Sequence, residues 1–61
     1  MNDEYNYKTI MNVLDISVKS AYNKMYGVTD YTMQELIKLK KHYQITFDEL
    51  FKIIEQYRKN Y

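Results

Sequence analysis

Apolar side chains recur every three or four residues along most of the chain, which is the spacing of one face of an α-helix. The longest such row lies near the end of the sequence and consists of Phe47, Leu50, Phe51, Ile54 and Tyr57. Shorter rows of the same spacing occupy the earlier parts of the chain. The pattern predicts four helices, at about residues 4–14, 18–26, 33–43 and 47–59.

Capping signals indicate where three of these helices begin. Two threonines are each followed three residues later by a glutamate, the pattern of a capping box, at Thr32 with Glu35 and at Thr46 with Glu49. Ser17 offers the same hydroxyl cap without the glutamate. Gly27, the single glycine, is expected to end the second helix in the left-handed conformation. The connections are short, so we expect one helical domain over residues 1–61 in which neighbouring helices pack together.

The composition argues against catalysis and metal binding. The chain has no cysteine and one histidine, His42, so thiolate and multi-histidine metal sites are excluded. It has no glycine-rich phosphate loop, and nothing in the pattern brings Ser17, His42 and Asp48 together as a catalytic set. We therefore expect a protein that is not an enzyme, needs no cofactor and has no small-molecule substrate.

Charge and hydropathy restrict the possible partners. No apolar run approaches the roughly 20 residues that cross a membrane, and the acidic, aromatic start MNDEYNY is unlike a signal peptide. A cytoplasmic protein without a membrane partner is expected. The net charge of +1 is weak support for nucleic-acid binding. Between residues 8 and 27, however, the sequence contains three lysines and one acidic residue, Asp15.

The first two predicted helices are arranged as a helix-turn-helix. The segment IMNVLDISVKSAYNKM places about three residues, Asp15 to Ser17, between two helices, and the second helix of such a motif can enter the DNA major groove. The turn needs a residue with positive φ, which is usually glycine. Asp15 stands there instead, and aspartate tolerates that conformation better than most residues.

These residues resemble those of the Cro/repressor-type helix-turn-helix family of phages and their relatives. The resemblance covers residues 8–54 and follows the segments LDISVKSAYNKMYG and YTMQELIKLKKHYQITFDELF. It implies an all-α fold, a compact four-helix, lambda-repressor-like domain. The family normally has one more helix at the start. Here it is either missing or merged into the helix at 4–14.

The resemblance also implies a function and the residues that perform it. The chain is expected to be a sequence-specific DNA-binding regulator, a phage- or mobile-element-like repressor of transcription that binds double-stranded DNA. The implied DNA contacts lie on or beside the second helix: Ser17 as cap and phosphate ligand, Val18, Lys19 and Asn23 at base edges, and Tyr22 and Lys24 at the backbone.

The absent first helix predicts a homodimer. Without that helix, apolar surface on the others lacks a cover, and a chain of this size has little stability to spare. The proposed dimer contacts lie on the last helix and are Ile53, Ile54, Tyr57 and Tyr61. With Lys8, Lys19 and Lys24 on each subunit, such a dimer would make roughly six phosphate contacts.

An alternative function keeps the fold and replaces the DNA with a protein. The chain would then be an inhibitor of the antirepressor or anti-CRISPR type, which the low net charge, the acidic start and the eight tyrosines also permit. Tyrosine suits protein interfaces because it joins an apolar ring to a polar tip. A continuous positive surface around Lys19 and Lys24 would favour DNA, whereas a mixed, tyrosine-rich face would favour a protein partner.

Overall fold

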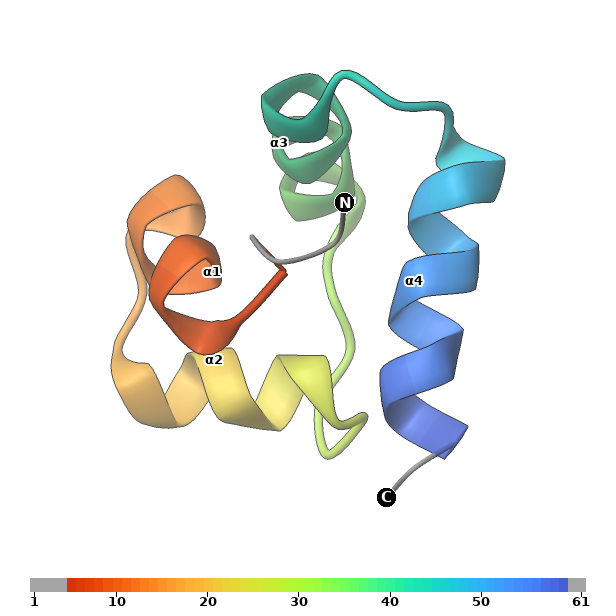
Figure 1. The fold of residues 1–61 in the computed structure, drawn as a ribbon. Coiled ribbons are helices and arrows are strands. Elements are labelled where there is room, and N and C mark those ends of the chain that lie inside the picture. The colour runs from red at the N-terminus through yellow and green to blue at the C-terminus, as the bar shows by residue number, and fades with distance from the viewer. Residues whose placement is uncertain (1–4, 60–61) are drawn as a thin grey trace.

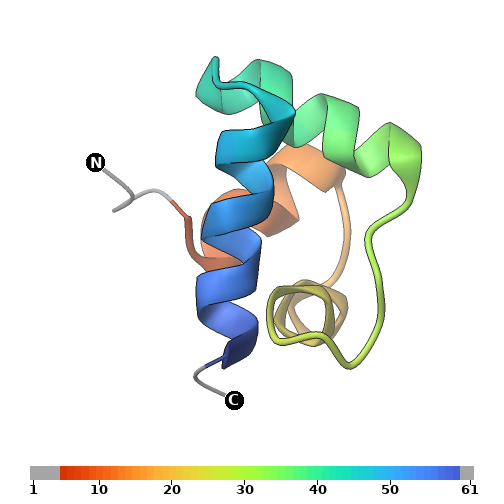
Figure 2. The same cartoon turned by 90° about the vertical axis from the view of Figure 1, so that its right-hand side faces the viewer.

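The computed structural model describes residues 5–59 and contains four helices and no strand within that range. The helices are α1 (Tyr7–Leu14), α2 (Val18–Met25), α3 (Met33–Tyr43) and α4 (Phe47–Lys59). In Figure 1, α2 lies along the lower edge of the domain, α1 and α3 lie above it, and α4 runs down one side. Figure 2, turned by 90°, shows α2 end-on beside the lower half of α4. The predicted all-α, four-helix fold is confirmed.

Hydroxyl caps begin the last three helices, as the sequence predicts. The Ser17 hydroxyl accepts the Ser20 backbone N–H at 3.2 Å. At both capping boxes the threonine hydroxyl accepts the N–H of the glutamate at 3.2 Å, and the carboxylate accepts the N–H of the threonine. The two returning bonds measure 2.8 Å at Thr32 and 3.0 Å at Thr46. Each cap satisfies amides that the first turn of a helix cannot pair internally.

Two predicted boundaries were wrong by a few residues. α1 begins at Tyr7 rather than near residue 4, because Asn6 is extended and its side-chain oxygen accepts the Thr9 N–H at 3.0 Å. An asparagine N-cap of this kind marks the start of a helix. α2 ends at Met25, one residue earlier than predicted, and Tyr26 forms its C-cap.

The first three helices end with the same local geometry. A residue of positive φ follows each helix, at Asp15 (57°), Gly27 (86°) and Gln44 (56°). The backbone N–H of the next residue then donates to the carbonyl five residues before it. The N···O distances are 3.2 Å for Ile16, 2.8 Å for Val28 and 3.3 Å for Ile45. This is the Schellman ending, which pairs carbonyls that the last turn leaves open. Asp15 and Gly27 were expected to take this role, and Gln44 was not.

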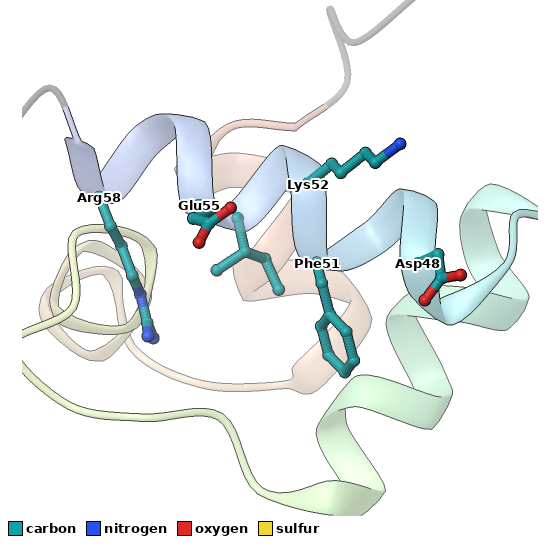
Figure 3. Close-up of a pocket in the computed structure, with 6 residues that line it drawn as sticks. Asp48, Phe51, Lys52, Glu55 and Arg58 are labelled. Atoms are coloured by element: carbon teal, nitrogen blue, oxygen red, sulfur yellow. The ribbon is translucent and has the colours of Figure 1, made fainter.

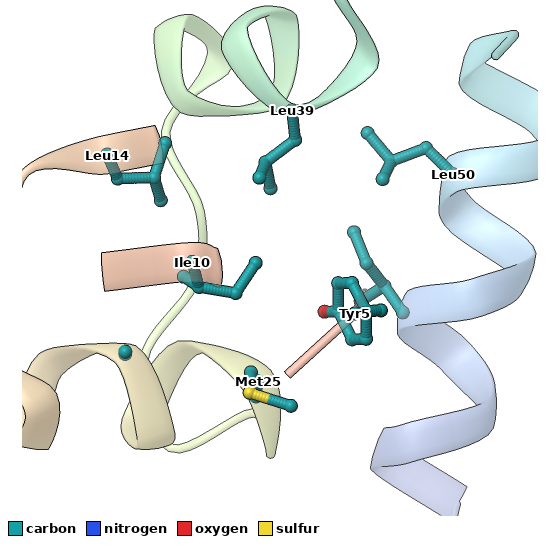
Figure 4. Packing of buried hydrophobic residues seen from close by; sticks show 8 residues of the cluster. Tyr5, Ile10, Leu14, Met25, Leu39 and Leu50 are labelled. Atoms are coloured by element: carbon teal, nitrogen blue, oxygen red, sulfur yellow. The ribbon is translucent and has the colours of Figure 1, made fainter. Parts of the chain in front are cut away.

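The core lies where the four helices converge (Figure 4). Its buried side chains come from every helix and from the segment before α1: Tyr5, Ile10, Leu14, Ala21, Met25, Leu39, Leu50 and Ile54. Ile16 and Ile45, which follow the two helix endings at Asp15 and Gln44, pack against this cluster. These two turns are therefore tied to the core by the residue directly after the positive φ.

Tyr5 occupies the centre of the domain although it belongs to no helix. Its side chain is 1% exposed, and its ring centroid lies 4.9 Å from that of Tyr57 and 6.3 Å from that of Tyr43. Its hydroxyl is hydrogen-bonded to that of Tyr31 at 2.9 Å. Burial, with Tyr31 alongside, raises the pKa of Tyr5 far above its ordinary value, so the phenol stays neutral.

Seven tyrosines form one connected network through the domain. Starting from the Tyr5–Tyr57 contact, ring contacts continue from Tyr57 to Tyr26 at 6.5 Å, to Tyr22 at 6.2 Å and to Tyr7 at 4.7 Å. Tyr43 and Tyr31 join at Tyr5. The high tyrosine content therefore serves the interior and its edges.

The positive φ at Gln44 predicts a stabilising substitution. A non-glycine residue in this conformation costs about 1–2 kcal/mol, and glycine avoids the cost while losing about 0.5–1 kcal/mol of chain entropy. Gln44→Gly should therefore stabilise the domain by about 0.5–1 kcal/mol in urea unfolding. Asp15→Gly should increase the free energy of unfolding by less, since aspartate accepts a positive φ more readily than glutamine. Gln44→Ala keeps the strain and should gain nothing. A destabilised Gln44→Gly variant would contradict this account.

Tyr5 is expected to be essential for stability. Tyr5→Ala removes a fully buried ring and should cost about 3 kcal/mol or more, a large part of the roughly 3–9 kcal/mol expected for a chain of this size. Tyr5→Phe keeps the ring and loses one hydrogen bond, so it should cost about 1 kcal/mol. Circular dichroism during urea unfolding measures both. Tyr7→Ala, at a half-buried ring, is the matched comparison, and an equal loss there would show that Tyr5 has no special role.

Candidate nucleic-acid interface

α2 presents one face to the core and another outward. Ala21 and Met25 point inward and are buried. Lys19, Tyr22 and Asn23 lie on the other side of the helix, since each residue adds about 100° of rotation. In Figures 1 and 2 the lower side of α2 is covered by no other helix. This is the position that the second helix of a helix-turn-helix needs for access to a groove.

The predicted contact residues fall into two groups. Ser17, Val18, Lys19 and Tyr22 are exposed, with Val18 at 44% and Tyr22 at 42%. Asn23 is partly buried, and its backbone carbonyl accepts the N–H groups of Val28 and Thr29 at 2.8 and 3.2 Å. The structure therefore brings five of the six predicted residues to the start and outer face of α2.

Tyr22 packs against two other rings. Its ring stacks on Tyr7 of α1, with centroids 4.7 Å apart and planes 20° apart. The ring of Tyr26 also lies near it, with centroids 6.2 Å apart and planes 12° apart. Such packing restricts the side chain before any partner binds, so less conformational entropy is lost on binding. The stack with Tyr7 also links the first turn of α1 to the outer face of α2.

Lys24, the sixth predicted residue, faces the domain itself. Its ammonium lies 3.0 Å from a Glu35 carboxylate oxygen and donates to the Asp30 carbonyl at 3.0 Å. The side chain is only 14% exposed. Burial favours a higher pKa for Glu35, but the Thr32 N–H and the Lys24 ammonium outweigh it and hold the pKa below its ordinary value of 4.5. Lys24 therefore ties α2 to α3. This geometry gives no support to its predicted contact with the DNA backbone.

Arg58 of α4 is a further residue that positions α2, and the sequence analysis missed it. Its guanidinium donates to the Lys24 carbonyl at 3.5 Å and lies 3.4 Å from the Asp30 carboxylate. A cation there complements the negative end of the helix dipole. A Cβ on Gly27 would lie 3.3 Å from the Arg58 side chain, so the glycine serves this close approach as well as its positive φ. The only sequence signal was a basic residue late in the last helix.

The predicted dimer residues mostly face inward. Ile54 is 6% exposed and belongs to the core, while Ile53 and Tyr57 are partly buried and pack against it. Tyr61 lies outside the described residues. Ile54 therefore serves mainly the core of its own domain, because the helix turns this side inward. The exposed aromatic residue on α4 is Phe51, which the apolar spacing had grouped with the core.

The positive charge at this surface is limited. Lys19 and Lys8 are exposed on α2 and α1, and Asp15 is exposed in the turn between the helices. Asp30, in the segment between α2 and α3, lies beside Arg58. With Lys24 paired to Glu35, two lysines per domain remain for phosphate rather than the three expected from the sequence.

A family model described as the BetR domain matches residues 2–60. The chain belongs to the BetR domain family. It is thus a small helical domain of a family associated with helix-turn-helix-like regulators, which agrees with the arrangement of α1 and α2. The match is to this family and not to the Cro/repressor-type family that the sequence resembles. No curated protein and no solved structure matches the chain.

Two further features of this BetR domain bear on its chemistry. Among residues 5–59, no group of three or more histidine, aspartate or glutamate side chains is placed to hold a metal ion. None of the helices described for this part of the chain has the length and apolar character required to span a membrane.

The lowered pKa of Glu35 predicts how stability depends on pH. A carboxyl whose pKa is lower in the folded state stabilises the fold above its unfolded pKa, and this contribution is lost as pH falls through the folded value. The domain should therefore lose stability below about pH 4.5. Glu35→Gln should cost about 1 kcal/mol at pH 7 and flatten the acid limb. Glu55→Gln, at an exposed carboxylate, should leave that limb unchanged. Equal acid limbs for wild type and Glu35→Gln would contradict the role of the Lys24–Glu35 pair.

Proposed function

We propose that this domain is a sequence-specific DNA-binding regulator of transcription, which inserts α2 into the major groove. One observation carries the proposal: α2 follows a tight turn after α1 and has exposed side chains at its start and on its outer face. The match to a family of helix-turn-helix-like regulators supports it. A major groove about 12 Å wide admits one α-helix of this kind.

The side chains on this face suit different parts of the groove. Lys19 can donate to the oxygen and nitrogen acceptors of guanine, and Asn23 can pair with adenine. Val18 offers an apolar contact for a thymine methyl group. Ser17 and Tyr22 have hydroxyls that can bind phosphate, which positions the domain without reading sequence. Lys8, exposed at the start of α1, adds a second cation for the backbone.

Two copies of the domain are expected to bind neighbouring half-sites, as in a phage-like repressor. The principal extents of one domain are 26 × 25 × 22 Å. Two such bodies side by side can separate their α2 helices by about 34 Å, one turn of DNA. With Lys8 and Lys19 from each copy, about four phosphates are neutralised. The logarithm of affinity should then fall with the logarithm of salt with a slope of about −4.

Substitution of Lys19 tests the proposal. Lys19→Ala should weaken binding to duplex DNA on the order of tenfold, because each good base or phosphate contact is worth about 1–3 kcal/mol. It should also reduce the salt slope by about 2 for a pair of subunits. Fluorescence anisotropy with a labelled duplex at several salt concentrations measures both effects.

The matched control is Lys38→Ala, which removes the same charge from an exposed position on α3. It should leave affinity and slope nearly unchanged if α2 is the contact. Equal losses for Lys19→Ala and Lys38→Ala would mean general electrostatic attraction rather than binding through α2. Absence of any binding at low salt would contradict the proposal altogether.

A second candidate function is inhibition of another protein through the same face. The stacked rings of Tyr7, Tyr22 and Tyr26 favour it, because tyrosine is enriched at protein interfaces, and so does the limited positive charge. This function predicts no binding to duplex DNA at any salt concentration, so the same titration separates the two.

A further inference from the structure

An exposed aromatic ring and an open groove lie together on the outer face of α4. Phe51 is 48% exposed, although large apolar side chains normally lie inside. It borders a groove of about 410 Å³ whose lining comes from α4 alone: Asp48, Phe51, Lys52, Ile54, Glu55 and Arg58. In Figure 3, Phe51 and Arg58 extend to one side of the helix and Lys52 to the other. A ring beside a groove can fill the same groove on a second copy.

The charges on this face alternate along the helix. Asp48 is negative, Lys52 positive, Glu55 negative and Arg58 positive, at intervals of four, three and three residues. These intervals keep Asp48, Lys52 and Glu55 together on one side of an α-helix, whereas Arg58 is held by the Lys24 carbonyl and Asp30 of its own domain. Among residues 5–59, the ion pairs of the domain involve neither Asp48, Lys52 nor Glu55. The three charges are therefore available to a partner.

The alternation is self-complementary in one direction only. When a second α4 lies antiparallel, Lys52 of each copy faces Glu55 of the other. When it lies parallel, each charge faces its own equivalent and repels it. An antiparallel pair also satisfies the two-fold symmetry of an isologous dimer, in which the same patch serves both subunits.

We propose that a second copy of this chain docks on the outer face of α4, antiparallel, with each Phe51 in the groove of the other copy. The central contacts are two symmetric Lys52–Glu55 pairs flanking the rings. The charges select the direction of the pair, while the apolar contact supplies most of the attraction. One helix face is a small interface, so the association is expected to be weak and dependent on concentration.

The pairing has a geometric consequence for DNA binding, which rests on the proposed function. α2 lies against the last turn of α4, where Arg58 meets the Lys24 carbonyl. In Figure 1 the uncovered side of α2 faces along the axis of α4, so an antiparallel pair turns the two uncovered sides in opposite directions. Such a pair cannot place both on neighbouring half-sites of one duplex, so pairing through α4 and binding of two adjacent half-sites exclude one another.

Charge reversal followed by sedimentation velocity tests the pairing without DNA. The full chain is measured from micromolar to millimolar concentration, and wild type should shift from monomer to dimer. Lys52→Glu alone and Glu55→Lys alone should each raise the dissociation constant on the order of tenfold, because each places like charges together twice. The double reversal, Lys52→Glu with Glu55→Lys, should restore wild-type association. Phe51→Ser should weaken it in the same way.

Lys38→Glu, a charge reversal on α3, is the control for a change of net charge and should leave association unchanged. Circular dichroism establishes that each variant is folded, which is expected because Lys52, Glu55 and Phe51 are exposed. A wild-type chain that remains monomeric throughout would overturn the proposal. So would a dimer that the single reversals do not weaken, or one that the double reversal fails to restore. None of these outcomes depends on whether α2 binds DNA.

Discussion

The burial of Tyr5 at the meeting point of the helices is the interaction on which the rest of the structure depends. A chain of 61 residues has a small core, and here one ring from outside the helices touches Tyr57 of α4 and Tyr43 of α3. Through its hydroxyl it also holds Tyr31, in the segment between α2 and α3. Aromatic rings bury more apolar area per residue than most side chains, which suits a domain of this size. The remaining tyrosines extend this network outward as far as Tyr22 on α2.

The small size of the core also explains how α2 is held in place. Its inner side is small, with Ala21 and Met25 as the buried residues, so burial alone gives it limited anchorage. Polar groups add to this at its C-terminal end, where Lys24 pairs with Glu35 of α3 and Arg58 of α4 lies over the last carbonyls. The outer face is thereby left free. A helix held at one end by charge and at the other by the Ser17 cap can present Lys19 and Tyr22 in a defined orientation.

Short-range signals could be predicted from the sequence, and long-range partners could not. The caps at Ser17, Thr32 and Thr46 act within one turn, so the starts of α2, α3 and α4 followed directly. The role of Tyr5 depends on rings 38 and 52 residues away, and the pairing of Lys24 depends on a glutamate on another helix. Phe51 shared the apolar spacing of its neighbours, yet the rotation of α4 about its axis turns it outward. That rotation is decided by packing against α2 and α3, which no local pattern contains.

The central claim is that the outer face of α2 meets DNA, and nuclear magnetic resonance tests it residue by residue. Backbone amide shifts of the full chain are followed while a short duplex of mixed sequence is added at low salt. The account predicts that the largest changes cluster at Ser17, Val18, Lys19, Tyr22 and Asn23, with smaller ones at Lys8. Changes confined to α3 and α4, or no changes at saturating DNA, would contradict it.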